Sequence, residues 1–212
     1  GKPNAVEIIL VGLNRLINEE KIDPNTTLAL IDFQNAFCEV KRQWFIDEVY
    51  RLFPQVSPWV EYVYGCSTLM FTGDDICYSH IGVQQGDPLS TLLFCLVLAL
   101  LLTELNKSYQ DQGVLIPNFA FLDDLTLLFQ SIQAGIEGIK MIKIIGPKYG
   151  LLVNQKTLLF QPCGSSTDSL DSCMRSGIKL CKENGVKLLN GGVSQHGEFF
   201  TSFTSNKIDS AI

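Results

Sequence analysis

The chain has 212 residues, 46% of them hydrophobic and 18% charged, which suffices for one substantial core and suits a single domain. Its net charge is −6, with seven basic and 13 acidic side chains in residues 1–108 and nine of each in residues 109–212, so it lacks the basic face of a protein that grips nucleic acid unaided. The longest apolar run, residues 92–102, is shorter than the roughly 18 residues that span a bilayer, and no signal peptide opens the chain, so we expect a soluble protein without membrane contact.

The first half of the chain predicts helices, one buried strand and a hairpin. Apolar residues with a 3.6-residue period predict an amphipathic helix over residues 5–17. A short apolar run between turn residues predicts a buried strand over 28–32, ending at Asp32. Two helices are expected next, from about 43 to 53 and from residue 57, and a β-hairpin over 67–81.

The second half opens with a long buried helix over 88–106, with Pro88 in its first turn. A hairpin of strands 118–122 and 125–130 follows, turning at Asp123 and Asp124. The remaining predicted elements are a helix over 132–145 closed by Gly146 and Pro147, a strand over 156–161, a polar loop over 164–172, and short strands within 177–181 and 185–192.

These elements predict an α+β fold, because strand 28–32, helix 88–106, the hairpin, helix 132–145 and strand 156–161 follow the ferredoxin-like β-α-β-β-α-β order, with residues 40–81 as an inserted helix and hairpin segment. A right-handed crossover makes strand 118–122 run in the direction of strand 28–32, so both end at the same edge of the sheet. Asp32, Asp123 and Asp124 are therefore expected to converge.

Three converging carboxylates repel one another unless divalent cations neutralise them, and oxygen ligands favour Mg²⁺ or Mn²⁺. Two such ions about 4 Å apart activate an attacking hydroxyl and stabilise leaving pyrophosphate, which is the chemistry of nucleotidyl transfer. The alternative is that the Asp123-Asp124 pair is a solvated turn, as we infer for Asp74 and Asp75 after Gly73.

Five motifs in order resemble those of reverse transcriptases, most closely the enzymes of non-LTR retrotransposons. They are DFQNAF at 32–37, GVQQGDPLSTLLF at 82–94, FLDD at 121–124, GLLVNQKT at 150–157 and LLNGGV at 188–193. The resemblance implies the palm of an RNA-directed DNA polymerase that binds two Mg²⁺ or Mn²⁺ ions through Asp32, Asp123 and Asp124. It further implies template and primer strands of RNA or DNA, and dNTP, as partners in the parent protein.

The resemblance also assigns roles to other residues. Phe33, Phe37, Gln85 and Gly86 are expected to bind the nucleotide, with Phe37 clashing with a ribose 2′-hydroxyl. Lys156 is expected to protonate or neutralise the pyrophosphate, although only Gln155 separates it from Asn154 where the family usually has two residues. The motif at 188–193 is expected to grip the primer end through Leu189, Gly191 and Gly192.

Simpler interpretations remain open for several of these residues: a core phenylalanine for Phe37, a turn before Pro88 for Gln85 and Gly86, and an exposed strand-end lysine for Lys156. With 31 residues before Asp32, the chain is expected to be one palm domain over 1–212 without the flanking fingers and thumb.

Two functions compete. The chain is either a polymerase palm or a non-catalytic reverse-transcriptase-like domain with a structural or assembly role; a cyclase-like two-metal enzyme is disfavoured by GVQQGDPLS. The seven cysteines are scattered singly without metal-ligand spacing, which predicts reduced core thiols in an intracellular, reducing compartment.

Overall fold

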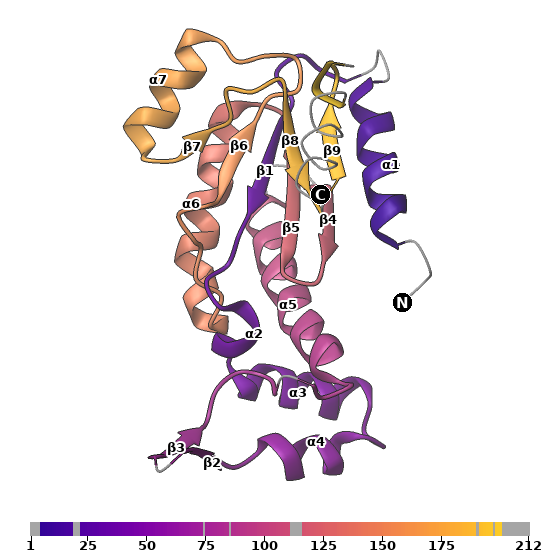
Figure 1. Ribbon diagram of the computed structural model, residues 1–212, viewed down its shortest axis with the longest axis vertical. Coiled ribbons are helices and arrows are strands. Elements are labelled where there is room, and N and C mark those ends of the chain that lie inside the picture. The colour runs from indigo at the N-terminus through magenta and orange to yellow at the C-terminus, as the bar shows by residue number, and fades with distance from the viewer. Residues whose placement is uncertain are drawn as a thin grey trace. The chain divides into compact units, whose positions relative to one another are not determined.

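The computed structural model describes residues 5–18, 22–73, 75–84, 86–110, 116–189, 191–196 and 198–200. The chain forms two compact units, whose elements are labelled in Figure 1. The first unit combines Gly1–Asp32, Ile116–Lys140 and Gln155–Ile212, and the second combines Phe33–Leu115 and Met141–Asn154. The single palm domain stays a prediction.

The first unit is built on a five-stranded sheet of order β4-β5-β1-β6-β7. Its strands are β1 (Thr27–Ile31), β4 (Asn118–Phe121), β5 (Asp124–Phe129), β6 (Leu158–Phe160) and β7 (Lys179–Leu180). Strand β5 pairs antiparallel with both β1 and β4, so β1 and β4 run in the same direction, as the crossover rule predicts. The chain order β1, α5, β4, β5, α6, β6 confirms the predicted β-α-β-β-α-β fold.

Helix α1 (Ala5–Asn18) and the hairpin of β8 (Gly185–Leu188) and β9 (Gly191–Ser194) complete a core of the first unit. The apolar stripe of α1 places Leu13 and Ile17 in this core, together with Leu28, Phe160, Val186, Leu188 and Val193. Asn14 of α1 donates to the carbonyl of Gly192 at 2.9 Å and accepts from the N–H of Ser194 at 3.2 Å. Helix α1 lies beside β9 (Figure 1) and holds it through both apolar and polar side-chain contacts.

The second unit is mainly helical. Its elements are α2 (Ala36–Glu39), α3 (Arg42–Leu52), α4 (Ser57–Tyr64), the hairpin of β2 (Thr68–Thr72) and β3 (Asp75–Ser79), α5 (Ser90–Gln110), and the C-terminal part of α6 (Ile132–Tyr149). The 40–81 segment thus holds the inserted helices and hairpin that the sequence predicts.

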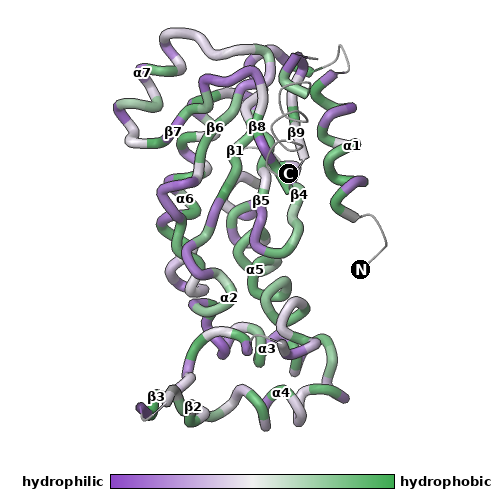
Figure 2. The backbone as a smooth tube through the Cα atoms, in the orientation of Figure 1, coloured by the Kyte–Doolittle hydropathy of each residue, from purple (hydrophilic) through white to green (hydrophobic). Residues whose placement is uncertain are grey.

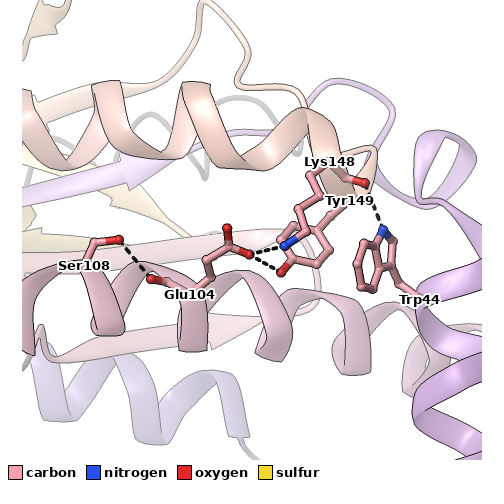
Figure 3. A network of polar contacts seen from close by, with 5 residues as sticks. All are labelled: Trp44, Glu104, Ser108, Lys148 and Tyr149. Atoms are coloured by element: carbon pink, nitrogen blue, oxygen red, sulfur yellow. Dashed lines mark hydrogen bonds and ion pairs between the residues drawn. The ribbon is translucent and has the colours of Figure 1, made fainter.

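A polar cluster ties the end of α6 to α5 and α3 in this unit (Figure 3). Glu104 accepts from the Lys148 ammonium at 2.7 Å and from the Tyr149 hydroxyl at 2.5 Å, and Trp44 donates to the carbonyl of Lys148 at 2.9 Å. The Lys148 ammonium also lies 5.1 Å from the centre of the Trp44 ring, a cation–π distance. Three separate segments of the unit are joined here.

Helix α5 is apolar along most of its length (Figure 2). Leu93, Phe94, Val97, Leu101 and Leu105 are each at most 1% exposed and form a buried stripe, as predicted for a core helix. Among the described residues, Ser90–Tyr109 is also long and apolar enough to cross a membrane, with a mean hydropathy of 1.6. The core helix of a globular domain passes the same test of length and composition.

The predicted bounds of two helices are wrong: α5 differs at both ends, since it continues past residue 106 to Gln110, and α6 differs at its C-terminal end. Helix α5 starts at Ser90, so Pro88 precedes it instead of lying in its first turn. Helix α6 continues through Gly146 and Pro147 and ends at Tyr149. Gly150 ends the helix with φ +83°. The N–H of Gly150 donates to the carbonyl of Pro147, and the N–H of Leu151 donates to the carbonyl of Gly146. These two hydrogen bonds form a Schellman cap.

The predicted polar loop over 164–172 is also wrong, because helix α7 (Thr167–Ser176) starts within it. The side chain of Ser166 caps α7 by accepting from the N–H of Ser169 at 3.1 Å, and Gly177 ends it with φ +66°. Cys173 is buried on its inner face. A capped helix with few apolar residues forms here where composition alone favoured a loop.

The cysteines differ from the predicted core thiols. All seven are free, but Cys173 alone is buried, while Cys38, Cys66, Cys77 and Cys163 are exposed. The small thiol side chain is tolerated on helices, strands and loops alike, so residue type did not decide burial.

Candidate functional site

Asp32 and the Asp123-Asp124 pair lie at one edge of the sheet in the first unit. Asp32 directly follows β1, and Asp124 is the first residue of β5. The register pairs Ile31 with Leu125 and Phe121 with Asp124, so the end of β1 and the β4–β5 turn are neighbours. Adjacent strands in a sheet are about 4.8 Å apart. The structure therefore brings together the three carboxylates that the sequence predicts to converge.

The charges of these carboxylates influence one another. Partial burial of its carboxyl group, together with the charges of Asp123 and Asp32, raises the pKa of Asp124. Asp123 and Asp124 are nevertheless exposed, as expected at a hairpin turn. Within the described ranges, no three His, Cys, Asp or Glu side chains are arranged as a metal-binding group. The three predicted metal ligands therefore lie near one another and their charges repel, but they do not form a metal-binding arrangement. Metal binding stays a prediction.

Thr157 fixes the backbone of Asp32 and was not identified from the sequence. Its hydroxyl accepts from the N–H of Asp32 at 3.0 Å and lies 3.2 Å from the carbonyl oxygen of Asp32. Thr157 is buried, at 6% exposure, and follows Lys156, which is exposed. One short segment therefore both anchors the first carboxylate and carries the predicted catalytic lysine.

A hollow of about 170 Å³ opens at this edge. Asp32, Asp124 and Lys156 line it, as does the predicted primer-grip residue Leu189. Lys187 of β8 lines it as well, a residue that the sequence motifs did not indicate. The first unit thus gathers carboxylates, lysines and the β8–β9 hairpin around one opening.

The hairpin residues predicted to grip the primer have packing roles of their own. A Cβ added to Gly191 would lie 2.3 Å from a methyl carbon of Leu10, so the close packing of α1 requires glycine there. A Cβ on Gly192 would meet the ring of Phe199 at 3.0 Å. Leu189 has φ +49° and Leu122, before the Asp pair, has φ +57°, a region that non-glycine residues adopt at a cost. Both turns beside the carboxylates are conformationally strained.

The residues predicted to bind the nucleotide all belong to the second unit. Phe33 is 5% exposed and forms a backbone bridge with Val153. Phe37 is half-buried and stacks on Phe94, with ring centres 4.5 Å apart. The packing of Phe37 matches the simpler interpretation of a core phenylalanine, and its role in sugar selection stays a prediction.

Gln85 lies outside the described residues, but its neighbour Gly86 has φ +90° and open space where a Cβ would stand. Glycine therefore suits this turn, and its backbone can be approached closely.

Tyr64 and Arg42, also in the second unit, hold the segment that carries Gly86. The buried Tyr64 hydroxyl donates to the carboxylate of Asp87 and accepts from the N–H of Gln84 at 3.2 Å. Burial, with the Asp87 hydrogen bond, raises the pKa of Tyr64 to about 12, so it keeps its proton at neutral pH.

Arg42 acts on the start of the same segment. It is 6% exposed and donates to the carbonyls of Gly82 at 2.9 Å and Ser79 at 3.0 Å. Neither Arg42 nor Tyr64 lies in a recognised motif, so only the fold reveals them.

Comparison with known proteins gives one family. The sequence matches the family "Reverse transcriptase (RNA-dependent DNA polymerase)" over residues 7–187. No curated protein matches it.

Solved structures of telomerase are similar in fold. A Candida albicans telomerase in complex with a fragment of telomeric RNA has a TM-score of 0.63 at 13% identity, over 92% of this chain and 33% of that one. A Candida tropicalis apo telomerase truncated from its C-terminal domain gives 0.62 at 15% identity, over 92% and 39%. The apo telomerase of the same species gives 0.60 at 12%, over 91% and 35%.

The chain therefore spans between a third and two fifths of the length of these telomerase chains. At identities this low, the structural similarity establishes a shared fold and nothing about activity. The family match rests on the sequence itself, covers residues 7–187, which are most of the chain, and includes the carboxylate edge. The chain thus belongs to the reverse transcriptase (RNA-dependent DNA polymerase) family.

Proposed function

We propose that the chain is the palm of an RNA-directed DNA polymerase, from a retroelement of the non-LTR type, that joins deoxynucleotides to a primer by two-metal nucleotidyl transfer. The observation that carries the proposal is the meeting of Asp32 with Asp123 and Asp124 at one sheet edge, where burial and then the like charges of Asp123 and Asp32 raise the pKa of Asp124. A cluster of repelling carboxylates is unfavourable unless cations offset it.

The donor set fits two Mg²⁺ or Mn²⁺ ions, which prefer carboxylate oxygens. Asp32, Asp123 and Asp124 would hold them. Bound there, the ions would supply activation of the primer hydroxyl and stabilisation of the pyrophosphate. Lys156, exposed at the hollow, would give its charge or a proton to the pyrophosphate.

Template, primer and dNTP are the partners that this function requires. The Candida albicans telomerase neighbour was solved with RNA, which supports a nucleic-acid partner for this fold. The telomerase chains are much longer than this one, which supports further segments, fingers and thumb, acting with it. Seven free cysteines support an intracellular, reducing location.

Extension of a labelled primer on an RNA template tests the proposal in the full-length protein that contains this chain. The unmodified protein should extend the primer with Mg²⁺ or Mn²⁺. Asp124→Asn should lose about a hundredfold or more, because misplacing the reacting groups by about 1 Å has effects of this size. Asp75→Asn, at the exposed hairpin of the second unit, is the matched control and should retain activity.

The alternative is a non-catalytic domain with a structural or assembly role. It is favoured by the lack of a metal-binding group within the described part of the chain. A full-length protein that binds primer–template but extends nothing with either metal would establish this alternative.

A further inference from the structure

Lys187 occupies a position on β8 that no motif assigns. Its neighbours Val186 and Leu188 are buried in the core of the first unit. Because side chains alternate along a strand, Lys187 projects from the opposite face, where it is exposed. It lines the same hollow of about 170 Å³ as Asp32 and Asp124. A cation therefore stands at the opening that the carboxylates share.

Among the residues that the structure describes, no side chain neutralises the charge of Lys187. Throughout the described part of the chain, its ammonium makes no ion pair within 4.0 Å and no hydrogen bond. Lysine next to carboxylates normally pairs with them, so an unpaired ammonium beside Asp32 and Asp124 is available to an anionic ligand.

The hairpin that carries Lys187 is firmly held. Lys187 pairs across the hairpin with Gly192, whose carbonyl accepts from Asn14 of α1 at 2.9 Å. Asn14 also accepts from the N–H of Ser194 at 3.2 Å, and Asn18 donates to the carbonyl of Ser194 at 3.2 Å. The base of the lysine is thus fixed by α1, while its long side chain is left to reach a ligand.

We propose that Lys187 binds a phosphate group of the substrate at the carboxylate edge. The inference rests on the proposed function, because it takes the ligand of the hollow to be a polymerase substrate. A lysine ammonium recognises phosphate as a point charge with three donors. The phosphate belongs either to the primer strand near its 3′ end or to the incoming nucleoside triphosphate.

The test uses the full-length protein with Lys187→Gln, which removes the charge, and Lys187→Arg, which keeps it. Lys140→Gln is the matched control, since Lys140 is exposed on α6 and lines a different hollow with Gln133 and Arg175. Binding of primer–template is measured in chelator across a range of salt, and the KM for dNTP is measured in Mg²⁺.

If the ligand is the primer phosphate, Lys187→Gln weakens binding several-fold and lowers the salt slope by about one. If it is the triphosphate, binding is unchanged and the KM for dNTP rises several-fold. In both cases Lys187→Arg restores most of the loss and Lys140→Gln has little effect. Unchanged binding and KM in Lys187→Gln, or an equal loss in Lys140→Gln, overturns the proposal.

The binding measurement also separates this inference from the function on which it rests. Asp124→Asn should lower extension about a hundredfold or more yet leave binding in chelator intact. A protein that never extends a primer refutes the polymerase function, and its response to Lys187→Gln then reports nucleic-acid binding alone.

Discussion

Burial and the charges of Asp123 and Asp32 raise the pKa of Asp124, so the folded chain disfavours its ionised form. A cation that binds only the folded carboxylates should offset this repulsion and stabilise the fold by mass action. We expect Mg²⁺ or Mn²⁺ to raise the melting temperature of the chain, and Asp123→Asn with Asp124→Asn to remove that response while leaving the fold intact. Thermal melting with and without metal measures both.

The double variant should also melt higher than the unmodified chain in chelator, because it removes two repelling charges. Asp75→Asn is the control, since Asp75 is exposed on β3. An equal loss of the metal response in Asp75→Asn would mean that the ions bind the acidic surface without specificity.

Phe37 separates a packing role from a role in sugar selection. If it selects deoxynucleotides, Phe37→Ala in the full-length protein should lower the preference for dNTP over NTP about tenfold or more, because the clash with a 2′-hydroxyl is gone. Steady-state extension with each nucleotide gives the ratio of kcat/KM values.

Phe94→Ala is the matched control for Phe37, since the two rings stack at 4.5 Å. Phe94→Ala should lower stability by about 3 kcal/mol or more because Phe94 is fully buried, and Phe37→Ala should lower it by less because Phe37 is half-buried. If the preference for dNTP over NTP is unchanged in both Phe37→Ala and Phe94→Ala, Phe37 has a packing role only.

Among the elements, helix α4 contacts the Gly86 segment through the hydroxyl of Tyr64, which Tyr64→Phe removes. The variant removes the donor to Oδ2 of Asp87, whose Oδ1 still accepts from the N–H of Leu89, and leaves the N–H of Gln84 without its Tyr64 acceptor. We expect a loss of about 1–2 kcal/mol in the free energy of unfolding. Hydrogen exchange should locate the change at the Gln84 amide.

Tyr62→Phe serves as control, because Tyr62 lies on the same helix and is 87% exposed. It should change stability by less than about 0.5 kcal/mol. Protection of the Gln84 amide that survives in Tyr64→Phe would show that other contacts hold the segment.

The end of α6 depends on Glu104, whose hydrogen bonds from Lys148 and Tyr149 lower its pKa. A lowered carboxyl pKa stabilises the fold above the unfolded value of 4.5, and that stabilisation is lost as the pH falls through the folded pKa. Glu104→Gln should therefore flatten the decline of stability below pH 4.5. Because the pair is partly exposed, the effect is small, about 0.5 kcal/mol.

Urea unfolding at several pH values measures the effect of Glu104→Gln. Glu137→Gln is the comparison, since Glu137 is exposed on α6 and accepts from Gln133 at 3.0 Å. An equal flattening in both variants would contradict a specific role for the Glu104 cluster.

The sequence predicted the elements that carry the carboxylates, and it did so for physical reasons. Alternation and apolar runs placed β1, β4 and β5, and the crossover rule alone brought Asp32 to the FLDD turn. Helix α7 was missed because its cap Ser166 and stop Gly177 lie in a polar segment. The predicted end of α6 at Gly146 and Pro147 was wrong because the helix continues through Pro147 to Tyr149 and ends where Gly150 adopts a positive φ.

Contacts between distant residues were beyond the sequence. Tyr64 with Asp87, and Thr157 with Asp32, are pairs separated by 23 and 125 positions. Lys187 alternates with buried residues in a way that predicts exposure but not the hollow it faces. Such pairs depend on packing, which local patterns do not encode.

The molecule as a whole is acidic, which conflicts with a polymerase that must hold nucleic acid. Its net charge is −6, and the described hollow places lysines next to carboxylates instead of in a basic groove. Phosphate neutralisation supplies most non-specific affinity, so the 212 residues alone should bind primer–template weakly, and more weakly as salt rises.

Nucleotidyl transfer needs metals, primer end and triphosphate aligned at once, and this chain spans between a third and two fifths of the telomerase chains it resembles in fold. We therefore expect primer extension by residues 1–212 alone to be undetectable or very slow, and to be restored when the flanking segments are supplied in the same chain. Extension of one labelled primer on an RNA template by the short and full-length proteins makes the comparison. Robust synthesis by the short form would show that the carboxylate edge and its two lysines suffice to hold the substrates, despite the charge.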